Sequence, residues 1–119
     1  MNRDFKLFID DILENIELIE NSTCKLSKIQ FESDRNIIDA TIRRLEVIGE
    51  AVKNLPELLI NKYSNIPWEE IAGTRDKIIH HYFGIDLDII WDIIKINIPD
   101  LKIKIQKIRE IEIKKKNFA

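Results

Sequence analysis

The side chains best suited to acid–base and phosphate chemistry gather in one short stretch, residues 73–86. This stretch holds both histidines of the chain and one of its two tyrosines, beside Arg75 and Asp76. Histidine titrates near neutrality, which makes it a common general acid or base. The planar guanidinium of arginine matches the geometry of a phosphate group. The combination therefore predicts a site that could hold and act on a phosphodiester.

Each of these residues also has an ordinary structural explanation. Arg75 could form a surface ion pair with Asp76 or Glu70, and from the residues alone this is the more frequent situation. His80 could be a capping or half-buried histidine, and Asp76 could simply favour the start of a helix. Tyr82 could be a core aromatic with a solvated hydroxyl. The residue types alone leave these alternatives open.

The punctuation of the stretch predicts one helix about ten residues long. Thr74 can serve as its N-cap, and Gly84 can take the left-handed conformation that closes a helix. At 100° per residue, Arg75 and Tyr82 would fall within about 20° of each other, whereas His80 would lie about 140° from Arg75. The arginine and the histidine would then converge only at a helix end, or where a two-fold axis joins two chains.

The spacing Arg75-Asp76-x-x-x-His80-x-Tyr82 resembles the signature of HEPN domains, specifically the HepT-like toxins that are paired with minimal nucleotidyltransferase antitoxins. The resemblance extends beyond the motif. Residues 45–53 are similar to the second-helix segment of that family, residues 66–73 to its lead-in, and residues 82–86 to its exit. Nearly the whole chain, from about residue 5 to residue 107, is covered.

The resemblance implies the toxin of a type VII toxin–antitoxin system, a metal-independent endoribonuclease that cleaves tRNA or mRNA. His80 would be the general base or acid, Arg75 would stabilise charge on the phosphorus, and Asp76 would orient the imidazole. Tyr82 matches the tyrosine that the cognate nucleotidyltransferase antitoxin modifies with AMP. The family is dimeric, so the expected partners are a second copy, the antitoxin and RNA. The alternative is a non-catalytic nucleotide-binding or adaptor subunit that docks a nucleotidyltransferase.

Composition narrows the classes of protein to which this chain could belong. A chain of 119 residues predicts a single domain, residues 1–119. The formal net charge of −2 lacks the basic excess of many polyanion-binding proteins, so any RNA contact must come from a local patch. The sequence suggests no cofactor and no metal ligand cluster. One cysteine, no long apolar run and no signal-peptide layout predict a cytoplasmic protein without a membrane segment.

Hydrophobic periodicity predicts an all-α fold: an up-and-down bundle of about four main helices with short helical turns. The first helix is expected over about residues 4–21. A second begins after Asp34 as its N-cap and stops before Pro56. Within that second helix, Gly49 predicts a close approach by another helix, because its lack of a side chain otherwise only costs helix stability.

Further signals mark the shorter elements. Ser27 and Gln30 form the pattern of a capping box. Pro67 suits the first position of a helix that leads into the motif. Asp86 is expected to cap the helix after the motif, and Pro99 is expected to end or kink it because proline removes a backbone donor.

Overall fold

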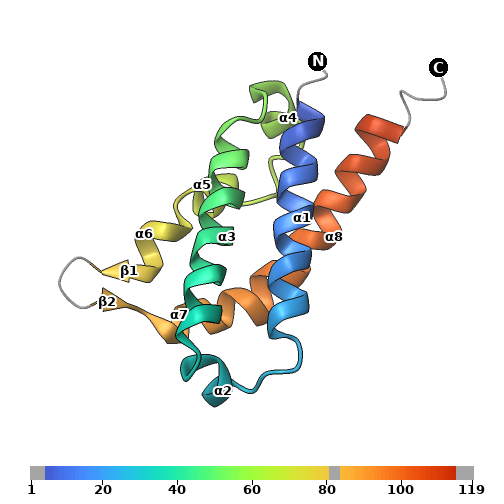
Figure 1. Cartoon of the computed structure of the whole chain (residues 1–119). Coiled ribbons are helices and arrows are strands. Elements are labelled where there is room, and N and C mark those ends of the chain that lie inside the picture. The colour runs from blue at the N-terminus through green and yellow to red at the C-terminus, as the bar shows by residue number, and fades with distance from the viewer. Residues whose placement is uncertain (1–4, 81–83, 115–119) are drawn as a thin grey trace.

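The computed structural model describes residues 5–80 and 84–114, without the side chains of His80 and Lys114, and most of these residues are helical (Figure 1). The prediction of an all-α bundle is confirmed. The elements in chain order are α1 (Phe5–Thr23), α2 (Lys28–Glu32), α3 (Arg35–Lys53), α4 (Glu57–Lys62), α5 (Trp68–Ala72), α6 (Thr74–Ile78), β1 (Ile79–His80), β2 (Gly84–Ile85), α7 (Leu87–Asp92), the π-helical turn η1 (Ile93–Asn97), α8 (Ile98–Arg109) and the π-helical turn η2 (Glu110–Lys114).

The core lies between α1, α3 and α8. Helix α3 packs along one side of α1 and α8 along another, while α5, α6 and the two strands lie on the far side of α3 (Figure 1). The apolar residues of α1 recur every three or four positions, which places them on one face, and burial of each contributes about 1.5–3 kcal/mol. The buried residues of α1 are Phe5, Ile9, Ile12, Ile16, Ile19 and Thr23.

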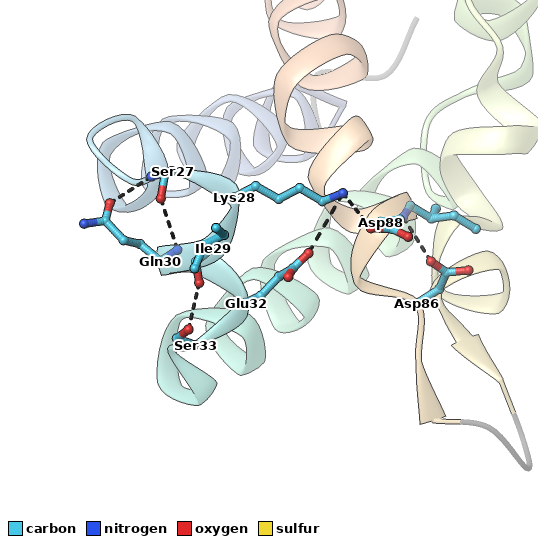
Figure 2. A network of polar contacts seen from close by, with 9 residues as sticks. Ser27, Lys28, Ile29, Gln30, Glu32, Ser33, Asp86 and Asp88 are labelled. Atoms are coloured by element: carbon cyan, nitrogen blue, oxygen red, sulfur yellow. Dashed lines mark hydrogen bonds and ion pairs between the residues drawn. The ribbon is translucent and has the colours of Figure 1, made fainter.

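Side-chain caps fix the starts of three helices where the sequence predicts them. The Ser27 hydroxyl accepts from the Gln30 backbone N–H at 3.2 Å, and the Gln30 side chain accepts from the Ser27 N–H at 2.9 Å (Figure 2). Asp34 and Asp86 each accept a hydrogen bond of 3.1 Å from the N–H three residues later. These bonds satisfy backbone donors that have no partner inside the helix.

Pro99 does not end the last helix. The helical run continues from α7 through η1 and α8 to η2, and Figure 1 shows it changing direction between α7 (orange) and α8 (red). Just before the proline, η1 widens the helix, and the N–H of Ile98 donates to the carbonyl of Ile93, five residues back. A π-helical turn of this kind accommodates a residue that lacks a backbone N–H, here Pro99, without ending the helix.

Gly49 marks the predicted close approach between helices. A Cβ atom at this position would lie 3.2 Å from the carbonyl oxygen of Ala72, at the end of α5. The indole Nε1 of Trp68 anchors the other end of α5 by donating to the Tyr63 carbonyl at 3.0 Å. Pro67 is the N-cap of α5 and not its first residue, one position away from the prediction. Helix α5 thus holds the motif segment against α3.

Candidate active site

The motif helix is much shorter than predicted. Helix α6 ends at Ile78, whose side chain is fully buried, and the chain then continues as strand β1. Thr74 is not the N-cap: Gly73 takes that position, and the Thr74 hydroxyl donates to the Glu70 carbonyl at 3.1 Å. Gly84 does adopt a positive φ of 79°, but it does so in β2 and not at the end of a helix.

The two strands form a small antiparallel ladder. Ile79 is paired with Ile85, and His80 with Gly84. At the base of this hairpin, the N–H of Asp86 donates to the carbonyl of Ile78 at 2.8 Å. Because α6 ends before His80, the angle of about 140° calculated for a straight helix does not apply. The hairpin, and not a helix face, carries the backbone of His80.

Helix α2 is tied to α7, the helix that follows the hairpin. The Lys28 ammonium lies 2.7 Å from the Asp88 carboxylate in the first turn of α7, and Figure 2 shows this contact beside the Asp86 cap. The hydrogen bond and charge of Asp88 raise the pKa of Lys28 above its ordinary value. The hairpin is therefore joined at one end to α6 and at the other to an α7 that is itself tied to α2.

Arg75 presents its guanidinium to solvent on the surface of α6. Its side chain is 57% exposed, and its Nε lies 3.4 Å from Oε1 of Glu46 on α3. Oε2 of the same glutamate lies 3.9 Å from Nη1 of Arg43. The ion pair that the sequence suggested with Asp76 or Glu70 is thus made with Glu46. The two arginines thus share this one carboxylate.

The other candidate residues are described only in part. Asp76 is exposed on α6, and its carboxylate makes no hydrogen bond or ion pair with any residue that the structure describes. The backbone of His80 lies in β1, but its side chain is outside the described part of the chain. Tyr82 lies in the gap between residues 80 and 84, so its predicted role falls outside the described residues. The orientation of the imidazole by Asp76 therefore stays a prediction.

A separate cavity of about 200 Å³ lies on another side of α6. Thr74 and Lys77 line it, whereas Arg75 and Asp76 do not. Its wall is largely apolar, with Leu45 among the residues of α3 that contribute. The Arg75 guanidinium, the group suited to bind a phosphate, thus lies on a different surface from this cavity.

Glu46 is the residue of the arginine cluster that the sequence did not reveal. It belongs to the α3 segment that resembles the family, but nothing in the sequence indicates which acid would reach Arg75.

In the described part of the chain, no helix is long and apolar enough to cross a lipid bilayer.

Comparisons with known proteins agree with one another. Residues 12–108 match the family described as "Ribonuclease HepT-like". A "Putative RNase" of Methanocaldococcus jannaschii is 50% identical over 111 residues, which cover 92% of each chain. The "Probable ribonuclease HepT" of Thermococcus cleftensis is 44% identical over 110 residues, covering 92% of this chain and 100% of its own.

One further relative is longer. A second protein of Methanocaldococcus jannaschii, named "Gamma-glutamylcyclotransferase and putative RNase", is 47% identical over 117 residues. The match covers 98% of this chain but 53% of that protein, so the chain spans about half of its length. No solved structure matches the chain.

Proposed function

This chain belongs to the HepT-like ribonuclease family, and we propose that it is a metal-independent endoribonuclease, the toxin of a type VII toxin–antitoxin pair. The observation that carries the proposal is the exposed guanidinium of Arg75, held on α6 immediately before the hairpin that carries His80. A cation that can stabilise charge on the phosphoryl oxygens and a histidine that can transfer a proton, both within one short segment, are suited to RNA cleavage without a metal.

In the proposed reaction the 2′-hydroxyl of RNA attacks the neighbouring phosphorus. Either His80 removes the hydroxyl proton and water protonates the departing 5′-oxygen, or water takes the hydroxyl proton and His80 protonates that oxygen. Asp76 holds the imidazole for this step. Arg75 stabilises the extra negative charge on the phosphoryl oxygens. The products are a 2′,3′-cyclic phosphate and a 5′-hydroxyl. Positioned acid–base groups contribute a factor of about 10²–10⁴, and one charge-stabilising donor about 10²–10³.

Cleavage of single-stranded RNA by the purified chain tests this function. Arg75→Ala and His80→Ala should each lower the rate about 10²–10⁴-fold with unchanged circular dichroism, and each should relieve toxicity on expression. Arg35→Ala, an exposed arginine paired within α3, is the control and should cleave normally. EDTA should not abolish cleavage. A strict requirement for a divalent ion would refute the mechanism, and a chain that binds a nucleotidyltransferase but never cleaves RNA would be the adaptor.

Tyr82 is the proposed switch, modified when its oxygen displaces pyrophosphate from ATP on the antitoxin. The state of the other tyrosine supports this choice. The Tyr63 hydroxyl donates to Oε2 of Glu112 at 2.7 Å, and burial together with that bond raises the pKa of Tyr63 to about 12. A hydroxyl so engaged is a poor nucleophile, because it is both occupied and reluctant to lose its proton.

The added AMP would bring a negative phosphodiester and considerable bulk to the site that must bind RNA. Tyr82→Phe should therefore keep most of the nuclease activity and escape neutralisation by a nucleotidyltransferase supplied with ATP. Tyr63→Phe is the matched control and should still be neutralised. Intact-mass spectrometry with peptide mapping checks the result. An adenylyl group on Tyr63, or neutralisation without any added mass, would make direct binding by the antitoxin the better explanation.

A further inference from the structure

The ion pair of Arg75 extends to a second arginine on another helix. Glu46 lies between the two, 3.4 Å from Arg75 through one carboxylate oxygen and 3.9 Å from Arg43 through the other. The side chain of Arg43 is 75% exposed and that of Arg75 57%, whereas that of Glu46 is 30% exposed. One half-buried carboxylate therefore holds together two guanidinium groups that are open to solvent.

Arg43 is distinct from the other basic residues of α3. Arg35 pairs with Asp39 at 3.0 Å and Lys53 with Glu50 at 3.3 Å, each within α3, as Arg43 also pairs with Glu46. Arg44 turns toward α1, where its Nη1 donates to the Ser22 hydroxyl at 3.1 Å. Within α3, Arg43 is thus the basic residue that shares an acid with the arginine of the motif.

A carboxylate between two arginines occupies the kind of position that a phosphate group fills, since both present charged oxygens to the guanidinium fork. The two arginines are exposed, and ion pairs of exposed arginines contribute little to stability, so their guanidinium groups can turn from Glu46 to an incoming polyanion at small cost. We propose that Arg43 is a second RNA-contact residue: Arg43 and Arg75 together bind the phosphodiester backbone, and Glu46 keeps them in place in the free protein. The inference rests on the proposed nuclease function.

The inference predicts opposite effects for the two members of the cluster on α3. Loss of one phosphate contact to a single strand should weaken RNA binding about fivefold at 0.1 M salt and reduce the salt slope by about 0.7. Arg43→Ala should show this in KM and binding, with kcat unchanged, because Arg43 contacts a neighbouring phosphate and not the scissile one. Glu46→Gln should tighten binding by about two- to fivefold, the range of a surface ion pair.

Fluorescence anisotropy with a single-stranded RNA that carries 2′-O-methyl groups measures binding without cleavage, between about 50 and 200 mM salt. Arg35→Ala is the matched control, because Arg35 is also 75% exposed, also on α3 and also paired with an acid. It should bind like the wild type. Equal affinities for Arg43→Ala and Arg35→Ala, or weaker binding by Glu46→Gln, would overturn the inference.

The same experiment separates this inference from the proposed function. If the wild type binds the methylated RNA through Arg43 but does not cleave unmodified RNA, the phosphate site stands and the nuclease does not. If the wild type cleaves RNA and Arg43→Ala leaves both KM and the salt slope unchanged, the nuclease stands and the role of Arg43 is refuted. A wild type that binds no RNA at any of these salt concentrations refutes both.

Discussion

The backbone N–H of Asp86 donates to the carbonyl of Ile78 at 2.8 Å, which joins the end of α6 to the start of α7. The carboxylate of the same aspartate accepts from the N–H of Ile89 and so caps α7. One residue therefore fixes both sides of the hairpin base, two positions after the register partner of His80. This makes Asp86 a positioning residue for the hairpin, in addition to its role as a helix cap.

Asp86→Ala keeps the backbone bond to Ile78 but removes the cap of α7. It should lower RNA cleavage about tenfold or more, because a displacement near 1 Å can cost about 10²-fold in rate. Asp34→Ala is the control: it removes an equivalent cap with the same 3.1 Å bond, away from the motif. Both variants should lose about 1 kcal/mol in urea unfolding. Asp86→Asn keeps a capping oxygen and should restore most of the activity. Equal cleavage rates for the two alanine variants would show that Asp86 is only a cap.

Signals that are local in sequence predicted the scaffold well. The caps at Ser27, Asp34 and Asp86 are correct because each depends on a side chain that reaches a backbone donor three residues away. The prediction of one motif helix about ten residues long was wrong for a physical reason. Residues 78–83 are β-branched, histidine or aromatic, types that lose side-chain freedom in a helix and favour extended backbone. The helix-boundary signals at Thr74 and Gly84 do not outweigh the preference of these residues for extended backbone.

The ion-pair partner of Arg75 could not be predicted from the sequence, because it is set by a long-range contact. Arg75 has acids at positions 70 and 76 as near neighbours, yet its partner is Glu46 on a different helix. The choice depends on how closely α5 and α6 approach α3, which in turn depends on Gly49. Such a contact is decided by packing between helices, so no spacing rule within one segment can predict it.

Gly49→Ala should destabilise the protein, although alanine normally improves a helix by about 1 kcal/mol. The new Cβ would meet the carbonyl oxygens of Ala72 and Ile71 at 3.2 and 3.4 Å, and backbone atoms of a neighbouring helix cannot rotate away. Overpacking of this kind costs about 1–3 kcal/mol. Thermal and urea unfolding measure the change. A rise in Tm would show that α5 moves freely and does not hold the motif segment in place.

We expect the chain to be a two-fold dimer, as the family resemblance implies. Sedimentation should give about twice the chain mass of 14.1 kDa. A dimer would present two copies of Arg75 and His80 to one cleft, so the arginine of one copy would act with the histidine of the other. Mixing Arg75→Ala with His80→Ala should then recover part of the activity in heterodimers. A monomer at micromolar concentration would exclude the shared cleft.

Tyr63 and Glu112 link α4 to the end of the last helix. Glu112 is 8% exposed and accepts from the Tyr63 hydroxyl and from the Lys62 ammonium, each at 2.7 Å. Burial is the larger cause, and the bond to Glu112 the next, of the rise in the pKa of Tyr63 to about 12. An unfolded tyrosine has a pKa of about 10, so the folded protein keeps this proton over a range in which the unfolded chain has lost it.

Stability should therefore fall as the pH rises from about 10 to 12, and Tyr63 should add no pH dependence below that window. Tyr63→Phe removes the titrating hydroxyl, so the difference in unfolding free energy between wild type and variant should be constant near pH 8 and shrink above about pH 10. Lys28 and Lys102, whose pKa values are also raised by acidic partners, are present in both proteins and cancel in the difference. Urea unfolding across this range, together with the ultraviolet absorbance of tyrosinate, measures both quantities. A difference that stays flat to pH 12 would mean that the Tyr63 hydroxyl ionises like an exposed tyrosine and that Glu112 does not hold its proton.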